Sequence, residues 1–148
     1  MSNTKDKSSD TGSFVVTVLV IDDSKTVRRM AAKYLTEAGW SVVTANDGFE
    51  ALAIVVDSQP DIVFADIMMP RLDGYQTCAL IKNNSDYCHI PVLMLSSRDG
   101  LYDRARGQAV GSDEHLSKPF TREALLDAVR RFVPSASTSE SNKPEVEF

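Results

Sequence analysis

The sequence has few of the features that mark secreted, membrane-spanning or metal-cluster proteins. Only two of its 148 residues are cysteines, Cys78 and Cys88, and their spacing fits neither a metal site nor a redox motif, so we expect reduced thiols. No apolar run approaches the length that crosses a membrane. The polar residues 1–13 lack the apolar stretch of a secretory signal. These absences predict a cytoplasmic protein that does not insert into a membrane.

An excess of positive charge is absent too. The 16 lysines and arginines are outnumbered by 21 aspartates and glutamates, which gives a net charge of -5. Such a chain has no electrostatic attraction for a phosphate backbone, so we expect no direct binding of nucleic acid. The remaining composition, 43% hydrophobic and 25% charged, is typical of one soluble domain with a single core.

Apolar residues are scarce at both ends of the chain. Residues 1–13 are rich in serine and threonine, and residues 134–148 are rich in serine, proline and glutamate. Segments of this kind bury too little apolar surface to offset the entropy of ordering them. We therefore expect a disordered tail over residues 1–13, one folded domain over residues 14–133, and a disordered acidic tail over residues 134–148.

Within residues 14–133, short apolar runs alternate with segments of helical periodicity. The run 15–21 is almost unbroken and rich in β-branched residues, as in a strand buried on both faces. A helix is expected to follow, between the N-cap Ser24 and the terminating Gly39. Further strands are expected at 40–44, 62–65, 92–95 and 114–116, and further helices around Leu52, Val55 and Val56, at about 72–83, around Tyr102, Ala105 and Ala109, and around Leu125, Val129 and Phe132.

This alternation predicts an α/β fold, a doubly wound parallel sheet of five strands with five helices on its two faces. The run 114–116 is short and polar, so we expect it at an edge of the sheet. Ligands of such sheets bind beyond the carboxyl ends of the strands, at the point where the strand order reverses.

Polar side chains stand at those carboxyl ends. Asp22 and Asp23 follow the first strand, Asp66 the third, Ser96 the fourth and Lys118 the fifth. With strand order 2-1-3-4-5, the three carboxylates converge at one edge, where they repel one another unless a cation is present. Oxygen ligands of this kind suit Mg²⁺. A hydroxyl and an ammonium facing them complete a pocket for a phosphoryl group, in which an aspartate can act as nucleophile.

The order and spacing of these residues, with the sequence MMPRLDG at 68–74, resemble the receiver domain of response regulators. The resemblance covers the whole predicted domain and implies a flavodoxin-like fold with strand order 2-1-3-4-5. The chain is similar to stand-alone receivers of the CheY-like type. The stretches 21–26, 66–84 and 95–100 are similar, more narrowly, to regulators of type IV pilus (twitching) motility.

The resemblance implies roles for individual residues. Asp66 would accept a phosphoryl group from a CheA-like histidine kinase. Asp23, Asp66 and the backbone carbonyl of Met68 would ligate Mg²⁺, with Asp22 acting nearby or through water. Lys118 would pair with the phosphoryl group and form a cis peptide bond with the following proline.

The resemblance also implies a switch. Ser96 would move to the phosphoryl oxygen, and His115 stands where the family usually has the tyrosine or phenylalanine that turns inward with it. Imidazole is smaller than those rings, but we expect His115 to act as the switch residue. The added charge of about -1.5 to -2 would then change the surface of the fourth helix, fifth strand and fifth helix, about residues 101–133, for a downstream protein effector.

Other functions remain open. The domain is able to serve as a phosphate sink for the kinase, or to act in flagellar chemotaxis. The same fold carries flavin proteins and phosphatases, but Asp22 and Asp23 would repel a flavin phosphate and do not form the Asp-x-Asp of haloacid-dehalogenase-type phosphatases. Neither Met68 nor Arg98 readily orients a hydrolytic water, which favours slow dephosphorylation and an effector role. We therefore predict no enzyme, but a phospho-acceptor that assists its own phosphotransfer and dephosphorylation.

Overall fold

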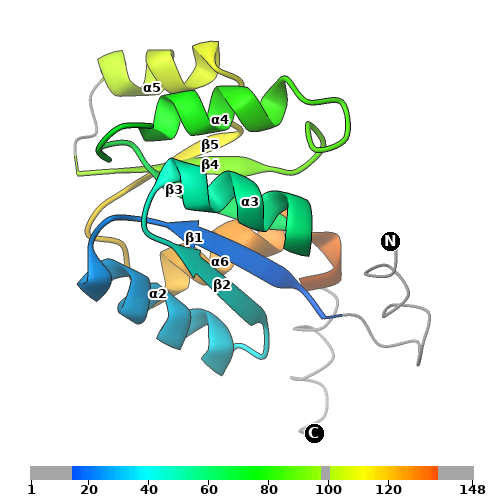
Figure 1. The fold of residues 1–148 in the computed structure, drawn as a ribbon. Helices are drawn as coiled ribbons and strands as arrows, with labels where there is room; N and C mark the ends of the chain where they lie inside the picture. Colours follow the sequence, from blue (N-terminus) through cyan, green and yellow to red (C-terminus); the bar gives the residue numbers. More distant parts are fainter. Residues whose placement is uncertain (1–14, 98–100, 137–148) are drawn as a thin grey trace, which may run out of the picture.

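The structure is a computed structural model that describes residues 15–97 and 101–136 (Figure 1). The predicted tail 1–13, Arg98 and all but the first three residues of the predicted tail 134–148 lie outside the described residues. The described chain runs past the expected domain end at residue 133, and Ala136 is buried in the core. In the described ranges, no helix is both long and apolar enough to span a bilayer.

The fold is a parallel five-stranded sheet with helices on both faces (Figure 1). The strand order is β2-β1-β3-β4-β5, which confirms the predicted topology and places β5 at an edge. The elements of the described residues are β1 (Thr17–Ile21), α2 (Lys25–Glu37), β2 (Ser41–Ala45), α3 (Gly48–Ser58), β3 (Ile62–Asp66), α4 (Gly74–Lys82), β4 (Val92–Ser96), α5 (Leu101–Ala109), β5 (Glu114–Ser117) and α6 (Arg122–Phe132).

The helices begin and end where the sequence signals lie. The Ser24 side chain accepts a hydrogen bond from the backbone N–H of Val27 at 3.3 Å and caps α2. After α2 the chain turns at Gly39, whose φ of +94° is open to glycine but strained for other residues. Asp47, Asp73 and Thr121 cap α3, α4 and α6 in the same way as Ser24 caps α2.

The core forms two layers, one on each face of the sheet. Helices α2 and α6 cover one face, and α3 and α4 cover the other, with α5 beside β5. Strands β3 and β4 are buried at every position, as their unbroken apolar runs predict, whereas all four residues of β5 are only half-buried. Burial on both faces therefore fixes β3 and β4, the strands that carry Asp66 and Ser96. Strand β5 is less enclosed than either of them.

The pairing register brings the predicted site residues to one edge of the sheet. Ile21, the last residue of β1, pairs with Ala65, and Asp66 pairs with Leu95. Ser96 in turn pairs with Ser117. Because the strands are parallel, the residues that end or directly follow β1, β3, β4 and β5 meet at the carboxyl edge.

Gly74, the first residue of α4, sets the distance between this helix and the end of β3. A Cβ at this position would collide with the carbonyl oxygen of Asp66 and lie 2.9 Å from the Cα of Ile67. Because those atoms belong to the backbone, Gly74→Ala is expected to lower the free energy of unfolding by about 1–3 kcal/mol. It should also displace Asp66 and slow the phosphoryl labelling by acetyl phosphate that the sequence predicts for this residue; urea unfolding and intact-mass spectrometry measure the two effects.

Gly39→Ala is the matched control for Gly74→Ala. Its Cβ would meet nothing within 4 Å, but the residue would have to adopt the φ of +94°. Backbone strain alone is expected to lower the free energy of unfolding by about 1–2 kcal/mol in Gly39→Ala and to leave the labelling rate unchanged. Equal labelling rates in Gly74→Ala and Gly39→Ala would show that the close approach of α4 to the end of β3 does not control the position of Asp66.

Candidate functional site

Three carboxylates gather at the carboxyl ends of β1 and β3. One carboxylate oxygen from each of Asp22, Asp23 and Asp66 lies within 4.8 Å of the others. Asp22 and Asp66 are buried and Asp23 is exposed. Lys118, which directly follows β5, places its Nζ 3.0 Å from Oδ2 of Asp22 and 3.2 Å from Oδ1 of Asp66. The structure thus brings together four residues from three separate segments of the sequence, as predicted.

The charges of this cluster are unbalanced, because one ammonium faces three carboxylates. Burial and the negative charge of Asp22 raise the pKa of Asp66 to about 6, although Lys118 offsets part of the shift. Burial disfavours the charge of Lys118, but the hydrogen bonds and charges of Asp22 and Asp66 together outweigh it and raise the lysine's pKa. An oxygen-only donor set with an excess of negative charge is suited to a hard divalent cation.

Asp22 is held in place through three of its oxygens. Its Oδ1 accepts a hydrogen bond from the backbone N–H of Ser24 at 2.9 Å, and its Oδ2 accepts one from Nζ of Lys118. Its carbonyl oxygen accepts Nη1 of Arg28 at 2.7 Å. Arg28 is half-buried on α2, with its guanidinium bonded to the backbone of the site. Since both carboxylate oxygens of Asp22 have partners, Asp23 and Asp66 are the better placed to hold a metal.

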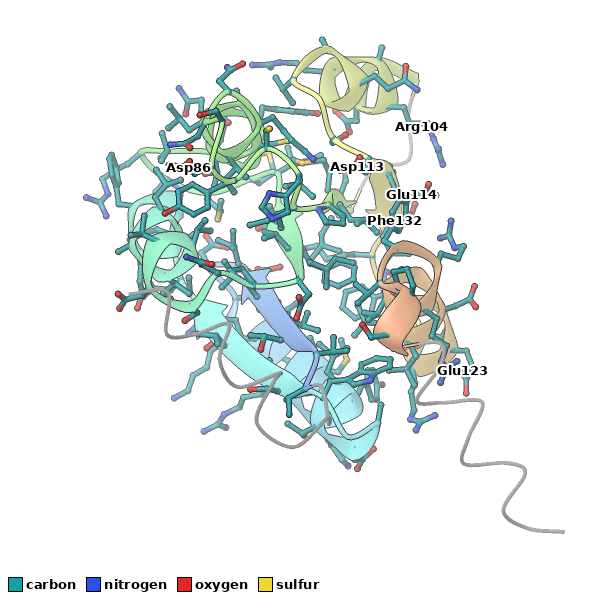
Figure 2. All side chains as sticks on the ribbon, turned by 90° about the vertical axis from the view of Figure 1, so that its right-hand side faces the viewer. Asp86, Arg104, Asp113, Glu114, Glu123 and Phe132 are labelled. Atoms are coloured by element: carbon teal, nitrogen blue, oxygen red, sulfur yellow. The ribbon has the colours of Figure 1, made fainter. Side chains whose placement is uncertain are left out.

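Ser96 and His115 lie on the same side of the sheet as α5. Ser96 is buried at the end of β4, and its Oγ donates to Oδ2 of Asp103 on α5 at 3.4 Å. His115 pairs with Met94 across β4 and β5 and is half-buried. It lines a cavity of about 170 Å³ together with residues of α5 and of the turn before β5. Figure 2 shows Arg104 and Glu114, two other residues of this cavity, near the β5 edge.

The Lys118–Pro119 peptide bond is cis, as the resemblance implies. Met68, whose backbone carbonyl is a predicted ligand, lies on the loop after β3, and 66% of the residue is exposed. Met69 and Met94 fill the core, as expected for a flexible apolar side chain. Both cysteines are free thiols, with Cys78 buried and Cys88 exposed.

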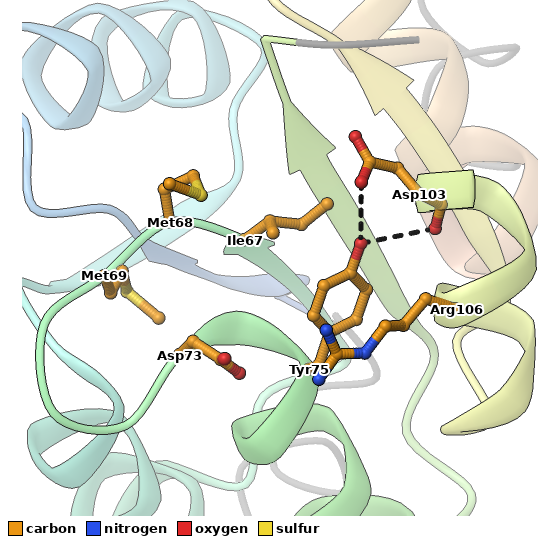
Figure 3. A pocket seen from close by; sticks show the side chains of 7 residues that line it. All are labelled: Ile67, Met68, Met69, Asp73, Tyr75, Asp103 and Arg106. Atoms are coloured by element: carbon orange, nitrogen blue, oxygen red, sulfur yellow. Dashed lines mark hydrogen bonds between the residues drawn. The ribbon is translucent and has the colours of Figure 1, made fainter. Parts of the chain in front are cut away.

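A pocket of about 510 Å³ opens between the loop after β3, which begins at Ile67, and helices α4 and α5 (Figure 3). Tyr75 of α4 lies at its wall, where the hydroxyl donates to Oδ1 of Asp103 at 3.2 Å. The guanidinium of Arg106 lies 4.4 Å from the centre of the Tyr75 ring. Neither Tyr75, Asp103 nor Arg106 stands at a strand end, and so no sequence signal identified them.

Comparison with known families agrees with this geometry. The family model of the response regulator receiver domain matches residues 18–130, almost the whole described domain. The chain therefore belongs to the family of response-regulator receiver domains, and it is a signalling protein of that class rather than a flavin protein or a phosphatase.

Among individual relatives, the chain is 62% identical over 118 residues to Protein PilG of Pseudomonas aeruginosa, which covers 80% of this chain and 87% of that protein. It is 38% identical to Response regulator MprA of a Mycobacterium species, over 90% of this chain but only 57% of that longer protein. Among solved structures, the chemotaxis protein CheY4 of Vibrio cholerae aligns with a TM-score of 0.78 and 35% identity, covering 81% of this chain and 100% of that one.

These comparisons establish the class of partner as well as the fold. A receiver domain implies a cognate histidine kinase, and the chain is similar to single-receiver regulators of the PilG and CheY type. The cluster of Asp22, Asp23 and Asp66 is able to bind a metal ion.

Proposed function

We propose that Asp66 is the phosphoryl acceptor of a cytoplasmic signalling switch and receives its phosphoryl group from a CheA-like histidine kinase. The observation that carries this proposal is the position of the Asp66 carboxylate, buried at the carboxyl end of β3 and 3.2 Å from the ammonium of Lys118. With its pKa raised to about 6, Asp66 is ionised at neutral pH and more basic than an exposed aspartate. It is therefore able to act as a nucleophile.

Asp23, Asp66 and the backbone carbonyl of Met68 would hold Mg²⁺, with Asp22 acting nearby or through water. The donor set fits this ion because it consists of oxygens, and because the partners of Asp22 leave Asp23 and Asp66 to the metal. When bound, the ion supplies positive charge beside the incoming phosphoryl group.

Phosphoryl transfer forms a bond between a carboxylate oxygen of Asp66 and phosphorus, and breaks the phosphorus–nitrogen bond of the kinase phosphohistidine. The ammonium of Lys118 stabilises the charge of the transferred group and keeps its hydrogen bond to Asp22. Hydrolysis of the acyl phosphate at the same site later restores Asp66. The domain would therefore assist both its own phosphorylation and its own dephosphorylation.

After transfer, the Ser96 hydroxyl would donate a hydrogen bond to a phosphoryl oxygen, and the His115 ring on the neighbouring strand would turn inward. Both residues face α5, so the change reaches the surface of α5, β5 and α6, where a downstream protein effector would bind. The 62% sequence identity to PilG and the stretches that resemble pilus-type regulators support control of type IV pilus (twitching) motility as the output.

Intact-mass spectrometry after incubation with acetyl phosphate tests the acceptor. We expect one added phosphoryl group on the wild type, dependent on Mg²⁺, and none on Asp66→Asn. Asp86→Asn, a change of an exposed carboxylate, is the matched control and should be labelled like the wild type. Labelling of Asp66→Asn, or no labelling of the wild type at any Mg²⁺ concentration, would refute the proposal.

A further inference from the structure

The hydroxyl of Ser96 is engaged by a residue that the proposed phosphotransfer does not use. Its Oγ lies 3.4 Å from Oδ2 of Asp103, which extends from α5 toward the end of β4. The other carboxylate oxygen of Asp103 accepts the hydroxyl of Tyr75 at 3.2 Å, and that hydroxyl also lies 3.4 Å from the Asp103 carbonyl (Figure 3). Ser96 and Tyr75, from β4 and α4, thus hold one carboxylate of α5 between them.

These hydrogen bonds are long enough to exchange at little cost. Bonds between two oxygens are usually 2.5–3.0 Å long, whereas those of the Asp103 carboxylate measure 3.2 and 3.4 Å. A serine hydroxyl carries a single proton, so its bond to Asp103 and a bond to a phosphoryl oxygen on Asp66 exclude each other. A phosphoryl group with about -1.5 to -2 charge is a stronger acceptor than a single carboxylate.

Release of Asp103 from Ser96 would change the contacts that hold α5 against the sheet. Asp103 lies in the first turn of α5, and Arg106, one turn later, stacks on the Tyr75 ring at 4.4 Å. The tyrosine contacts α5 through Asp103 and Arg106, and the serine contacts it through Asp103. When the serine leaves, Asp103 keeps its bond to Tyr75 of α4 and loses its bond to the end of β4.

We propose that Asp103 is a positioning residue that holds the Ser96 hydroxyl away from the acceptor until Asp66 is phosphorylated, and that loss of this bond transmits the change to α5. This inference rests on the proposed function and deepens it, because it names a route to the effector surface that does not pass through His115. Asp103 competes with the phosphoryl group, so its removal favours the phosphorylated arrangement.

Binding of beryllofluoride, a stable substitute for the phosphoryl group on a carboxylate, measures this competition at equilibrium. Fluorine NMR of the full chain with Mg²⁺ and excess fluoride gives the beryllium concentration at half-saturation. Asp103→Ala is expected to lower that concentration by about 2- to 10-fold, the range of one exchanged hydrogen bond. Asp86→Ala removes an exposed charge elsewhere and should leave it unchanged.

A double-mutant cycle separates the hydrogen bond from the charge of Asp103. In a Ser96→Ala background no hydroxyl remains for Asp103 to hold, so Asp103→Ala should then change the half-saturation concentration by less than about 2-fold, which is the usual error of additivity. An equal gain with and without the serine hydroxyl would mean that Asp103 acts by its charge alone, and would overturn the inference. Unchanged binding in Asp103→Ala would overturn it too. Absence of any beryllofluoride binding by the wild type would instead refute Asp66 as the acceptor.

Discussion

Asp66→Asn is expected to raise the free energy of unfolding by on the order of 2–3 kcal/mol at pH 8 in the absence of divalent cations. The pKa of Asp66 rises from 3.8 to about 6 on folding, chiefly because of burial and then because of the charge of Asp22. Each pKa unit corresponds to about 1.4 kcal/mol, so keeping this carboxylate ionised opposes folding. The amide of asparagine has the same shape and carries no charge, which removes that cost.

The pH dependence follows from the direction of the shift. Between pH 3.8 and about 6, the folded protein binds more protons at Asp66 than the unfolded chain does. The stability of the wild type therefore falls as pH rises through this window. The advantage of Asp66→Asn should be complete above about pH 6 and vanish toward pH 3.8.

Urea unfolding followed by circular dichroism, with a metal chelator at pH 4, 5, 6 and 8, measures this difference. Asp86→Asn is the control, because Asp86 is exposed and its loss should change stability by less than about 0.5 kcal/mol at every pH. An Asp66→Asn variant no more stable than wild type at pH 8 would show that the site carries no electrostatic strain.

Lys118→Met is expected to have the opposite effect and to lower the free energy of unfolding by about 3 kcal/mol at pH 8 without metal. The Lys118 side chain is 18% exposed, and it pairs with the buried carboxylates of Asp22 and Asp66 at 3.0 and 3.2 Å. Removing one partner of a buried pair costs about 3–5 kcal/mol because the other charge stays uncompensated. Methionine fills a similar volume, so packing should change little.

The pH dependence of the loss in stability and the effect of a second substitution identify the cause of the loss in Lys118→Met. The pKa of Lys118 is raised in the folded protein, so its ion pairs stabilise the wild type below its ordinary value of 10.5 and are lost only as pH rises through the higher folded value. In the variant, Asp66 should hold its proton to higher pH than in wild type, which makes the loss smaller at pH 5 than at pH 8.

Adding Asp66→Asn to Lys118→Met should recover part of the loss, because it removes one of the unpaired charges. Lys33→Met, which breaks an exposed pair with Glu37, should cost less than about 1 kcal/mol. A Lys118→Met variant equally destabilised at pH 5 and pH 8, and unaffected by Asp66→Asn, would contradict the electrostatic explanation.

The fold and the cluster of charges were predictable because both depend on strong local patterns. Strands buried on both faces require unbroken apolar runs, and parallel strands place their carboxyl ends together. Asp22 and Asp66 follow or end strands of this kind, and Lys118 follows the polar edge strand β5, so their meeting follows from the parallel strand order. The cap at Ser24 and the turn at Gly39 were predictable for the same reason, since each depends only on its own residue type.

Features that depend on the rotation of a helix were not predictable. The apolar residues expected to mark the inner face of α5 include Ala105 and Ala109, but both are exposed, whereas Gly107 between them is buried. In α3, Val55 is buried while Val56 is 57% exposed. Helices α3 and α5 carry apolar residues that are not confined to one face, so periodicity does not identify the inner side.

The partners of the site residues depend on the same rotations. The contact of Asp103 with Ser96 needs the position of α5, and the bond from Arg28 to the backbone of Asp22 needs a long side chain to fold back along α2. Sequence spacing identifies the polar groups that meet at the strand ends, but it does not identify the groups that hold them in place.

The polar composition of β5 bears on the solubility of the protein as well as on signalling. An edge strand offers a row of backbone donors and acceptors with which a strand of another molecule is able to pair. The side chains of β5 include Glu114 and His115, and Arg131 of α6 lies 3.7 Å from Glu114 at this edge. Charged groups in this position oppose the addition of a sixth strand from a neighbouring chain. The polar residues that make β5 a weak strand in the sequence thus oppose edge-to-edge association of the sheet.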